Sequence, residues 1–279
     1  MITTLTRTRS VQGPAKLLLV PALAVGLLAA FLPVAPAVAN DVGKCGMYAI
    51  GHRGDHRNYD ENTIGAVTGL SHSETDLRVT KDGQFVLMHD RNVRRTTNGE
   101  GYVDELSWDY IRSLRTEPRG DRVPTWRRAL RAIKRSGTML SVEVKSYGAT
   151  WTRQELRQAV RLVRQMGLRN RVFLGGTAGA MPVLEEVAAD MQLYWRPKRR
   201  DRVSAATVSA HNAAAVLIHP RNLDKRVVRR AKRGGAVVWA RRSKKPKELT
   251  IQQYWSRIAS SRAKGLYTDT PYTFDRWCG

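Results

Sequence analysis

Residues 50–90 read IGHRGDHRNYDENTIGAVTGLSHSETDLRVTKDGQFVLMHD, and this stretch decides the fold. It begins in a predicted strand over residues 47–52 and contains a second predicted strand over 75–80. Lys81-Asp82-Gly83 then makes a tight turn into an extended segment over 84–89. So short a turn joins only antiparallel strands, because a parallel crossover needs about a dozen residues or more. We therefore expect residues 84–89 to be a hairpin arm folded back over the second strand.

The rest of the chain alternates short strand patterns with helical ones. Helical patterns are expected over 61–71, 108–114, 126–136, 153–166, 181–189, 203–211, 225–233 and 251–264. Further strands are expected over 139–145, 171–174, 192–195, 214–218, 236–240 and 266–268. Without the hairpin arm the strands number eight, which predicts an α/β fold, the (β/α)₈ TIM barrel, with a hairpin and insertion after the second strand. An open doubly wound sheet is the alternative, but it would need a glycine-rich nucleotide turn that is missing.

Residues 1–39 have the pattern of a secretory signal peptide. Three basic residues precede an almost wholly apolar run over 17–32, and Ala37-Val38-Ala39 offers a cleavage site before Asn40. A retained membrane anchor is the alternative, but three prolines and the small residues at the end favour cleavage. We therefore expect a secreted, extracellular protein with a single barrel domain over residues 40–279.

The chain is strongly basic, with 48 Lys and Arg against 24 Asp and Glu. The leader holds three basic and no acidic residues, so its removal takes the net charge from +24 to +21. Such a surface would attract an anionic phosphodiester substrate, an anionic wall polymer or a membrane surface. The alternative is that the positive charge is a general property of the surface. No zinc-finger, recognition-helix or RNA-binding signature is present, so we expect no specific nucleic-acid partner. No motif indicates a stable protein partner.

The two cysteines of the chain, Cys45 and Cys278, lie near the two ends of the predicted mature domain. In an oxidising exterior a disulfide between them is the natural expectation, and two unpaired thiols are the alternative. Such a bridge would bring the chain ends together, as in a closed barrel.

Acidic residues lie near the predicted carboxyl ends of neighbouring strands, where a barrel of this class places its active site. Glu74 and Asp76 are two residues apart, so their side chains share one face of an extended segment. Glu143, at the end of the next strand, would complete a three-carboxylate site. Oxygen ligands of this kind favour Ca²⁺ or Mg²⁺ over zinc. An exposed polar strand face is the alternative for Glu74 and Asp76.

Two histidines, an arginine and a lysine fall beside these carboxylates. One of His52 and His89 could deprotonate a nucleophile while the other protonates a leaving alkoxide, with structural hydrogen bonding as the alternative. Arg53 could grip phosphate oxygens. Lys145 is either a phosphate contact or a partner of Glu143. This inventory indicates metal-assisted hydrolysis of a phosphate ester.

Taken in order, the motifs resemble the glycerophosphodiester phosphodiesterase family. The matching blocks are His52-Arg53-Gly54, Glu61-Asn62-Thr63, Glu74-x-Asp76, TKDG over 80–83, His89-Asp90, Arg95-Thr96-Thr97-x-Gly99-x-Gly101, Glu143-x-Lys145 and Thr268-Asp269-x-Pro271. The resemblance covers most of residues 48–271 and is densest over 50–101. It implies a (β/α)₈ barrel that hydrolyses glycerophosphodiesters to glycerol 3-phosphate and an alcohol with a divalent cation, Ca²⁺ or Mg²⁺.

The resemblance also implies roles for individual residues. These are an acid–base pair of His52 and His89, metal binding by Glu74, Asp76 and Glu143, phosphate contacts from Arg53 and Lys145, and a structural role for Glu61 and Asn62.

The chain departs from the family pattern at three places. The segment 64–73 is several residues shorter than usual, residues 239–242 read WARR in place of a Trp-Thr-Val-Asn-like run, and residues 173–176 lack a serine. These departures concern substrate preference more than the reaction. We expect Trp195 and Trp239 to form the wall of the pocket on the alcohol side, with core packing as an equal alternative.

Two other functions stay open. A sphingomyelinase D-like phospholipase shares the Glu-x-Asp arrangement but lacks the complete HRG and ENT set present here. A basic barrel that binds polyanions or cell wall without catalysis fits the charge, although both histidines and all three carboxylates are retained.

Overall fold

The computed structural model describes residues 42–145, 151–176, 179–198 and 203–279. The predicted signal peptide lies outside these residues, so it stays a prediction. No helix in the described ranges combines the length and the apolar character needed to cross a bilayer.

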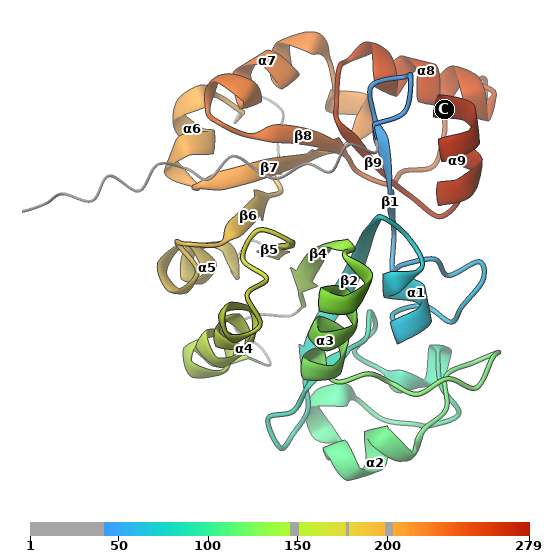
Figure 1. The fold of residues 1–279 in the computed structure, drawn as a ribbon, viewed down its shortest axis with the longest axis vertical. Coiled ribbons are helices and arrows are strands. Elements are labelled where there is room, and N and C mark those ends of the chain that lie inside the picture. Colours follow the sequence, from blue (N-terminus) through green and yellow to red (C-terminus); the bar gives the residue numbers. More distant parts are fainter. Residues whose placement is uncertain (1–41, 146–150, 177–178, 199–202) are drawn as a thin grey trace, which may run out of the picture. The chain divides into compact units, whose positions relative to one another are not determined.

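Eight parallel strands form a closed ring in the order β1-β9-β8-β7-β6-β5-β4-β2, and Gly51 of β1 pairs with Ser73 of β2 to close it (Figure 1). A ninth strand, β3, pairs antiparallel with β2 outside the ring. The predicted TIM barrel and the hairpin arm are therefore confirmed. The strands are β1 (Tyr48–Gly51), β2 (His72–Val79), β3 (Phe85–Leu87), β4 (Met139–Val144), β5 (Val172–Gly176), β6 (Gln192–Trp195), β7 (Ala213–Ile218), β8 (Val237–Ala240) and β9 (Gly265–Thr268).

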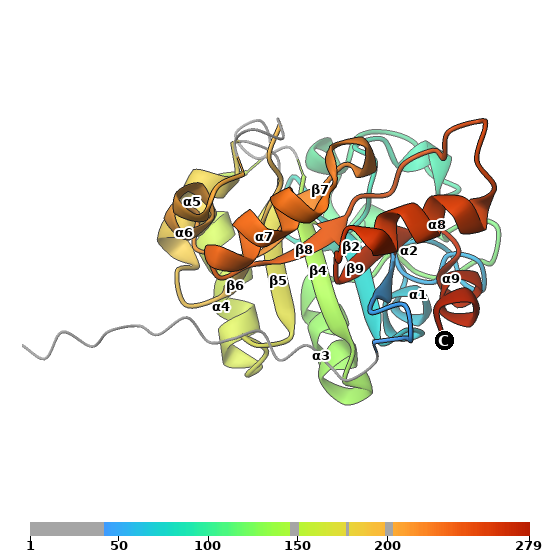
Figure 2. The same cartoon turned by 90° about the horizontal axis from the view of Figure 1, so that it is seen from above.

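Helices cover the outside of the ring, and Figure 2 shows α7 and α8 lying across the strands. Most of the helices begin at a residue whose side chain accepts a hydrogen bond from a backbone amide of the first turn. At α4, for example, the Thr152 side chain accepts from the amide of Glu155, whose carboxylate accepts from the amide of Thr152. The helices are α1 (Ile64–Thr68), α2 (Trp108–Ser113), α3 (Trp126–Ser136), α4 (Arg153–Gln165), α5 (Met181–Val187), α6 (Ala205–Ala210), α7 (Lys225–Arg233), α8 (Ile251–Ser260) and α9 (Pro271–Cys278).

The ring separates two hydrophobic cores, because successive side chains of a strand point to opposite faces. The outer core packs the strands against the helices and is the larger of the two. The inner core fills the barrel with aromatic side chains, among them Tyr48, Phe173, Tyr194, Trp239 and Tyr267. A Cβ atom at Gly175 would lie 2.5 Å from the Tyr194 ring, so glycine at this position makes room for the tyrosine.

The insertion after β3 has a core of its own, built around Val93, Val103 and Ile111. A buried carboxylate ties it to the loop after β1. The hydroxyl of Thr116 donates to Asp60 Oδ2 at 2.7 Å, and the amide of Arg119 donates to the same oxygen at 3.0 Å. The insertion is thus held against the barrel beside the site.

A disulfide joins Cys45 and Cys278, whose Cα atoms lie 4.9 Å apart. The amide of Cys45 also donates to the carbonyl of Cys278 at 3.1 Å. Cys45 precedes β1, and Cys278 lines a cavity with Leu70 and Ser71, which precede β2. The bridge therefore lies at the end of the barrel where the strands begin.

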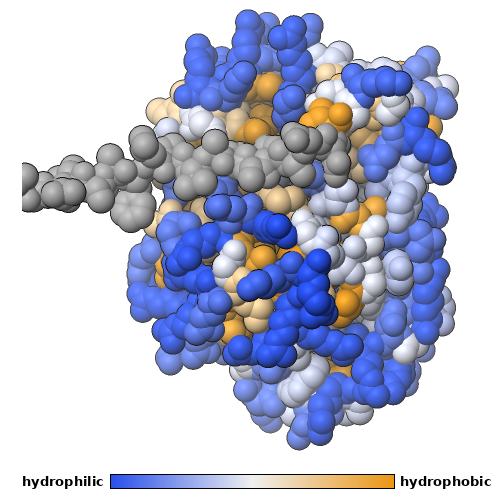
Figure 3. Space-filling view, viewed as in Figure 1, coloured by the Kyte–Doolittle hydropathy of each residue, from blue (hydrophilic) through white to orange (hydrophobic). Residues whose placement is uncertain are grey.

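The surface is mainly polar. The face drawn in Figure 3 is dominated by hydrophilic side chains, with small apolar patches between them. This agrees with the excess of lysine and arginine in the sequence.

Candidate active site

Three carboxylates meet inside the barrel at the end where the strands finish. Glu74 and Asp76 project from β2, and Asp76 is paired in register with Glu143 of β4. One oxygen from each of the three lies within 4.8 Å of the others. Glu74 and Asp76 are only 2% and 1% exposed. The predicted shared face is therefore the inside of the barrel, and the carboxylates are gathered as expected.

The chain after β1 holds these carboxylates in place through two residues in the left-handed region. Arg53 has a φ of 61°, and its amide donates to Glu74 Oε2 at 2.7 Å. Asn62 has a φ of 60°, and its Nδ2 donates to Asp76 Oδ2 at 3.0 Å. The carbonyl oxygen of the Asn62 side chain accepts from Thr75 Oγ1 and from the amide of Asp76. Such backbone conformations are uncommon outside glycine and are concentrated at functional sites.

Two cations offset part of the negative charge of this cluster. Lys145 Nζ lies 2.9 Å from Asp76 Oδ1 and 2.9 Å from Glu143 Oε2. Arg196, which follows β6, lies 3.1 Å from Glu143 Oε1 through Nη1. Lys145 thus partners both carboxylates, which includes the Glu143 pairing considered from the sequence.

The three carboxylates do not share their charge evenly. Burial raises the pKa of Glu74 well above its ordinary value, and the nearby charges of Asp76 and Glu143 raise it further. Burial also opposes ionisation of Asp76, but the charge of Lys145 outweighs it and lowers the pKa of Asp76. Burial alone would lower the pKa of Lys145, whereas Asp76 and Glu143 raise it overall. The ammonium therefore stays charged beside Asp76 and Glu143, and ionisation of Glu74 is the most disfavoured of the three.

This cluster has the chemistry of a hard-cation site. All three donors are carboxylates, which Ca²⁺ and Mg²⁺ prefer, and no thiolate or imidazole lies among them. The residues present therefore fit a divalent cation, which would relieve the repulsion that raises the pKa of Glu74.

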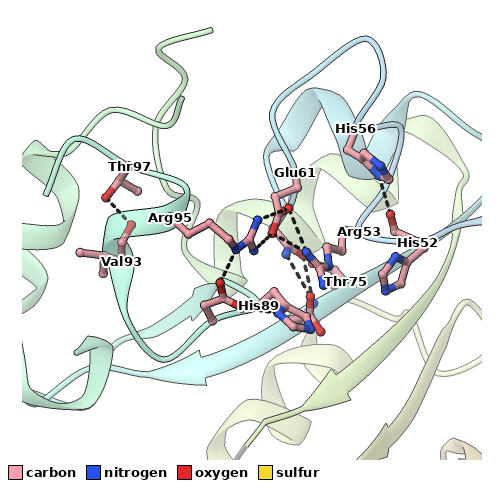
Figure 4. Close-up of polar contacts among 12 residues, drawn as sticks. His52, Arg53, His56, Glu61, Thr75, His89, Val93, Arg95 and Thr97 are labelled. Atoms are coloured by element: carbon pink, nitrogen blue, oxygen red, sulfur yellow. Dashed lines mark hydrogen bonds and ion pairs between the residues drawn. The ribbon is translucent and has the colours of Figure 1, made fainter. Parts of the chain in front are cut away.

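One predicted histidine, His52, follows β1 and is oriented by a residue close to the carboxyl terminus of the chain. His52 Nδ1 lies 2.9 Å from Asp269 Oδ1, just after β9. The other carboxylate oxygen of Asp269 accepts from Arg242 Nε. His56 Nδ1 lies 2.8 Å from the carbonyl oxygen of His52 (Figure 4). Burial opposes the ionisation of Asp269, but the hydrogen bonds from His52 and Arg242 hold its pKa at about 2.

The second histidine arrives from the hairpin. The amide of Met88 donates to the Asp76 carbonyl, which brings the next residue, His89, beside the carboxylates. His89 Nδ1 lies 2.6 Å from Asp90 Oδ1. Burial lowers the pKa of His89 and the charge of Asp76 opposes this shift. Each predicted histidine therefore has a carboxylate at Nδ1.

A single carboxylate links the two halves of the site. Arg53 Nη1 donates to both oxygens of Glu61, at 3.2 and 3.0 Å, and Arg95 of the insertion donates to the same two oxygens, at 2.6 and 2.9 Å (Figure 4). Arg95 also donates to Asp90, the partner of His89. Glu61 therefore connects the loop after β1 to the segment that carries His89.

The two predicted tryptophans lie in different cores. Trp239 is 3% exposed inside the barrel, where its Nε1 donates to the Tyr48 hydroxyl at 2.7 Å. Trp195 is in the outer core, with its ring 4.4 Å from that of His211. These positions agree with the core-packing alternative, and the structure does not bring Trp195 to the carboxylates.

Sequence reasoning missed several residues of the site. Arg196 contacts Glu143, which lies 53 positions earlier in the chain, so no local sequence motif could predict this contact. His56 and Arg242 are also new members. Arg242 was noticed only as a departure from a family pattern, whereas it hydrogen-bonds the carboxylate that orients His52.

The fold and the site define a parallel (β/α)₈ barrel with an acidic centre and two carboxylate-bound histidines at its active end. Residues 52–273 match the model of the Glycerophosphoryl diester phosphodiesterase family. The chain belongs to this family, and the resemblance seen in the motifs is confirmed.

Curated relatives carry the same name over part of their length. A glycerophosphodiester phosphodiesterase of Caldanaerobacter subterraneus is 32% identical over 136 residues, 45% of this chain and 56% of that protein. Glycerophosphodiester phosphodiesterase 1 of Mus musculus is 34% identical over 112 residues, 36% of this chain and 34% of that protein. The chain thus spans about a third to a half of these relatives.

Solved structures support the fold over nearly the whole domain. A glycerophosphodiester phosphodiesterase from Agrobacterium tumefaciens aligns with a TM-score of 0.69 at 22% identity, covering 82% of this chain and 99% of that one. An Oleispira antarctica phosphodiesterase in complex with sn-glycerol-3-phosphate aligns with the same TM-score at 19% identity, covering 82% of this chain and 96% of that one.

Proposed function

We propose that this protein hydrolyses glycerophosphodiesters to glycerol 3-phosphate and an alcohol, with a divalent cation and a pair of histidines. The observation that carries the proposal is the cluster of Glu74, Asp76 and Glu143, flanked by two histidines that each hold a carboxylate at Nδ1. Family membership and the names of the relatives support the same substrate class.

The two histidines are suited to proton transfer because of their Nδ1 partners. A carboxylate at Nδ1 favours the tautomer with the proton on that nitrogen, which leaves the lone pair on Nε2. Among the described residues, neither His52 nor His89 has a hydrogen-bond partner at Nε2. One imidazole starts in the neutral form and removes a proton at Nε2 from the attacking hydroxyl. The other starts as the imidazolium, with a second proton on Nε2, and gives that proton to the leaving alkoxide.

The carboxylates Glu74, Asp76 and Glu143 would hold the cation. When bound, a Ca²⁺ or Mg²⁺ ion supplies positive charge to the phosphate oxygens as a Lewis acid. Lys145 and Arg196 add fixed positive charge at the edge of the cluster. The Arg53 side chain is bound to Glu61, so its contribution is to position the loop after β1 and, through its amide, Glu74.

Release of glycerol 3-phosphate from glycerophosphocholine tests this function. We expect release with Ca²⁺ or Mg²⁺, loss of release with chelator, and a large loss in His52→Ala and in Glu74→Ala. His211→Gln is the matched control, because His211 lies on the outside of the barrel, bound to Glu185. No release by folded protein with either ion would refute the proposal, and cleavage of sphingomyelin instead would favour a phospholipase of the sphingomyelinase D type.

We also propose that the protein acts outside the cytoplasm. The leader pattern of residues 1–39 supports this, and the disulfide between Cys45 and Cys278 suits an oxidising compartment. Amino-terminal sequencing of the protein recovered from culture medium tests it: a start near Asn40 is expected. Recovery of the uncleaved chain with the cells alone would contradict secretion.

A further inference from the structure

Three neighbouring strands of the barrel are each followed by a basic or imidazole side chain. Arg196 follows β6, His219 follows β7 and Arg241 follows β8. Since these strands are parallel, the three residues lie at the same end of the barrel as His52 and Lys145. A cavity of about 230 Å³ opens between them. We call it the cation pocket; its polar lining is Arg196, Lys198, His219, Arg221, Asn222 and Arg241.

The positive charge of the cation pocket is largely uncompensated. Its described lining includes no acidic residue, and neither Arg221 nor Arg241 forms a side-chain ion pair with any described part of the chain. Burial lowers the pKa of Arg241, and the charge of Arg196 lowers it further. Burial likewise lowers the pKa of His219, as do Arg221 and Arg241. Glu143, the ion-pair partner of Arg196, offsets only part of this charge, and like charges with too few counterions favour the binding of an anion.

The cation pocket is directly connected to the carboxylate centre. Arg196 belongs to its lining and also donates to Glu143 Oε1 at 3.1 Å. A substrate held at the carboxylates therefore has one side facing a group of cations. A cationic alcohol such as choline would meet repulsion there. An alcohol that bears a phosphate would meet charge-assisted hydrogen-bond donors.

We propose that the cation pocket binds a second phosphate on the alcohol side of the scissile phosphodiester. The preferred substrates are then glycerophosphodiesters whose alcohol is itself phosphorylated. This rests on the proposed function, because it names the substrate class of the same site.

The test compares two probes that differ by one phosphate, glycerophosphoglycerol and glycerophosphoglycerol phosphate. For the unmodified protein at low salt we expect kcat/KM to be roughly tenfold higher for the phosphorylated probe, the size expected of one or two charge-assisted contacts. The Arg221→Gln, Arg241→Gln double variant should bring this ratio close to one, mainly through a higher KM for the phosphorylated probe. The preference should also fall as salt is added.

The matched control removes the same two charges elsewhere. Arg131 of α3 and Arg161 of α4 are exposed on the outer helices, so the Arg131→Gln, Arg161→Gln variant should keep the preference. An equal loss in both double variants would show a general charge effect and overturn the cation pocket, as would equal hydrolysis of both probes by the unmodified protein.

Hydrolysis of glycerophosphoglycerol, the probe without the second phosphate, separates the two proposals. If that probe is cleaved without any preference for the phosphorylated one, the second-phosphate site fails and the proposed function stands. If folded protein cleaves glycerophosphocholine but neither probe, the second-phosphate site fails alone. If it cleaves none of the three, the proposed function fails and the second-phosphate site falls with it. Glycerol-phosphate oligomers and glycerophosphoinositol phosphate then distinguish a polymer from a phosphorylated head group as the source of the anion.

Discussion

His52 Nδ1 lies 2.9 Å from Asp269 Oδ1, although 217 positions separate the two residues in the chain. The contact joins the end of the first barrel strand to the end of the last. It fixes the orientation of the imidazole and the nitrogen that carries its proton. Asp269 is thereby a positioning residue, and its removal should affect turnover more than substrate binding.

Asp269→Asn should lower kcat by roughly 10- to 100-fold, a part of what a general acid or base contributes, because the amide no longer favours one tautomer of His52. KM should change by only a few-fold. Steady-state kinetics with glycerophosphocholine measure both, with Asp109→Asn as a control on an exposed carboxylate of α2. A variant that changes KM alone would contradict the positioning role.

The Asp269 carboxylate also predicts that the free energy of unfolding falls at acid pH. The pKa of Asp269 is about 2 in the folded protein, below the ordinary value of 3.8, so its ionised form stabilises the fold above pH 3.8 and this contribution is lost as the pH falls through 2. The amount is about 2 kcal/mol. Denaturant unfolding between pH 5 and pH 2 should show a weaker acid dependence in Asp269→Asn. Parallel curves for the two proteins would rule this out.

Lys145→Met should make the protein more dependent on a divalent ion for stability. Removal of the ammonium leaves Asp76 and Glu143 without their shared cation, so their repulsion destabilises the metal-free protein. Addition of Ca²⁺ or Mg²⁺ should then raise the Tm of the variant more than that of the unmodified protein. Thermal unfolding with and without chelator measures this. Equal shifts in the two proteins would show that Lys145 does not substitute for a cation.

Glu61→Gln should destabilise the protein by about 2 kcal/mol, because the variant leaves Arg53 and Arg95 without their shared carboxylate. Glu100→Gln breaks the ion pair with Arg94, in which both side chains are more than 70% exposed, and should change stability by less than about 0.5 kcal/mol. Denaturant unfolding of both variants provides the comparison. A similar loss in both would mean that Glu61 has no special linking role.

The periodic parts of this structure could be predicted from sequence. The two-residue spacing of Glu74 and Asp76 placed both side chains on one face, and the short turn at 81–83 excluded β3 from the ring. Strand β2 nevertheless begins at His72, three residues earlier than expected, since it reads as a mixed polar segment yet is buried throughout. Helix α9 was not predicted, although Pro271 at its first turn is a recognised helix-start signal.

The contacts that complete the site could not be predicted in the same way. Arg196 reaches Glu143 from two strands away, and Arg95 reaches Glu61 from within an irregular insertion. Such pairings depend on the closure of the barrel and on the path of loops, which hydrophobic periodicity does not encode. Arg53 shows the same limit, because its side chain binds Glu61 in the structure while the motif alone indicated phosphate.

Replacing both cysteines by serine should lower the free energy of unfolding by roughly 5 kcal/mol at most, since the bridge closes a loop of nearly the whole domain. The activity per folded molecule should stay unchanged, because Cys278 lies beside residues that precede β2, away from the carboxylates. Unfolding and kinetic measurements on the double variant check both statements. The same measurements on the unmodified protein, before and after reduction of its disulfide, provide the comparison. A fall in kcat for folded double variant would contradict them.

This bridge has a consequence for how the protein can change over evolutionary time. It joins the first and last segments of the domain at one end of the barrel, while the three carboxylates and the two histidines lie at the other end. The stability that the bridge gives and the chemistry of the carboxylate end can therefore be selected almost independently. Loops such as those that follow β6, β7 and β8 are free to diversify in charge without loosening the closure on which every strand depends.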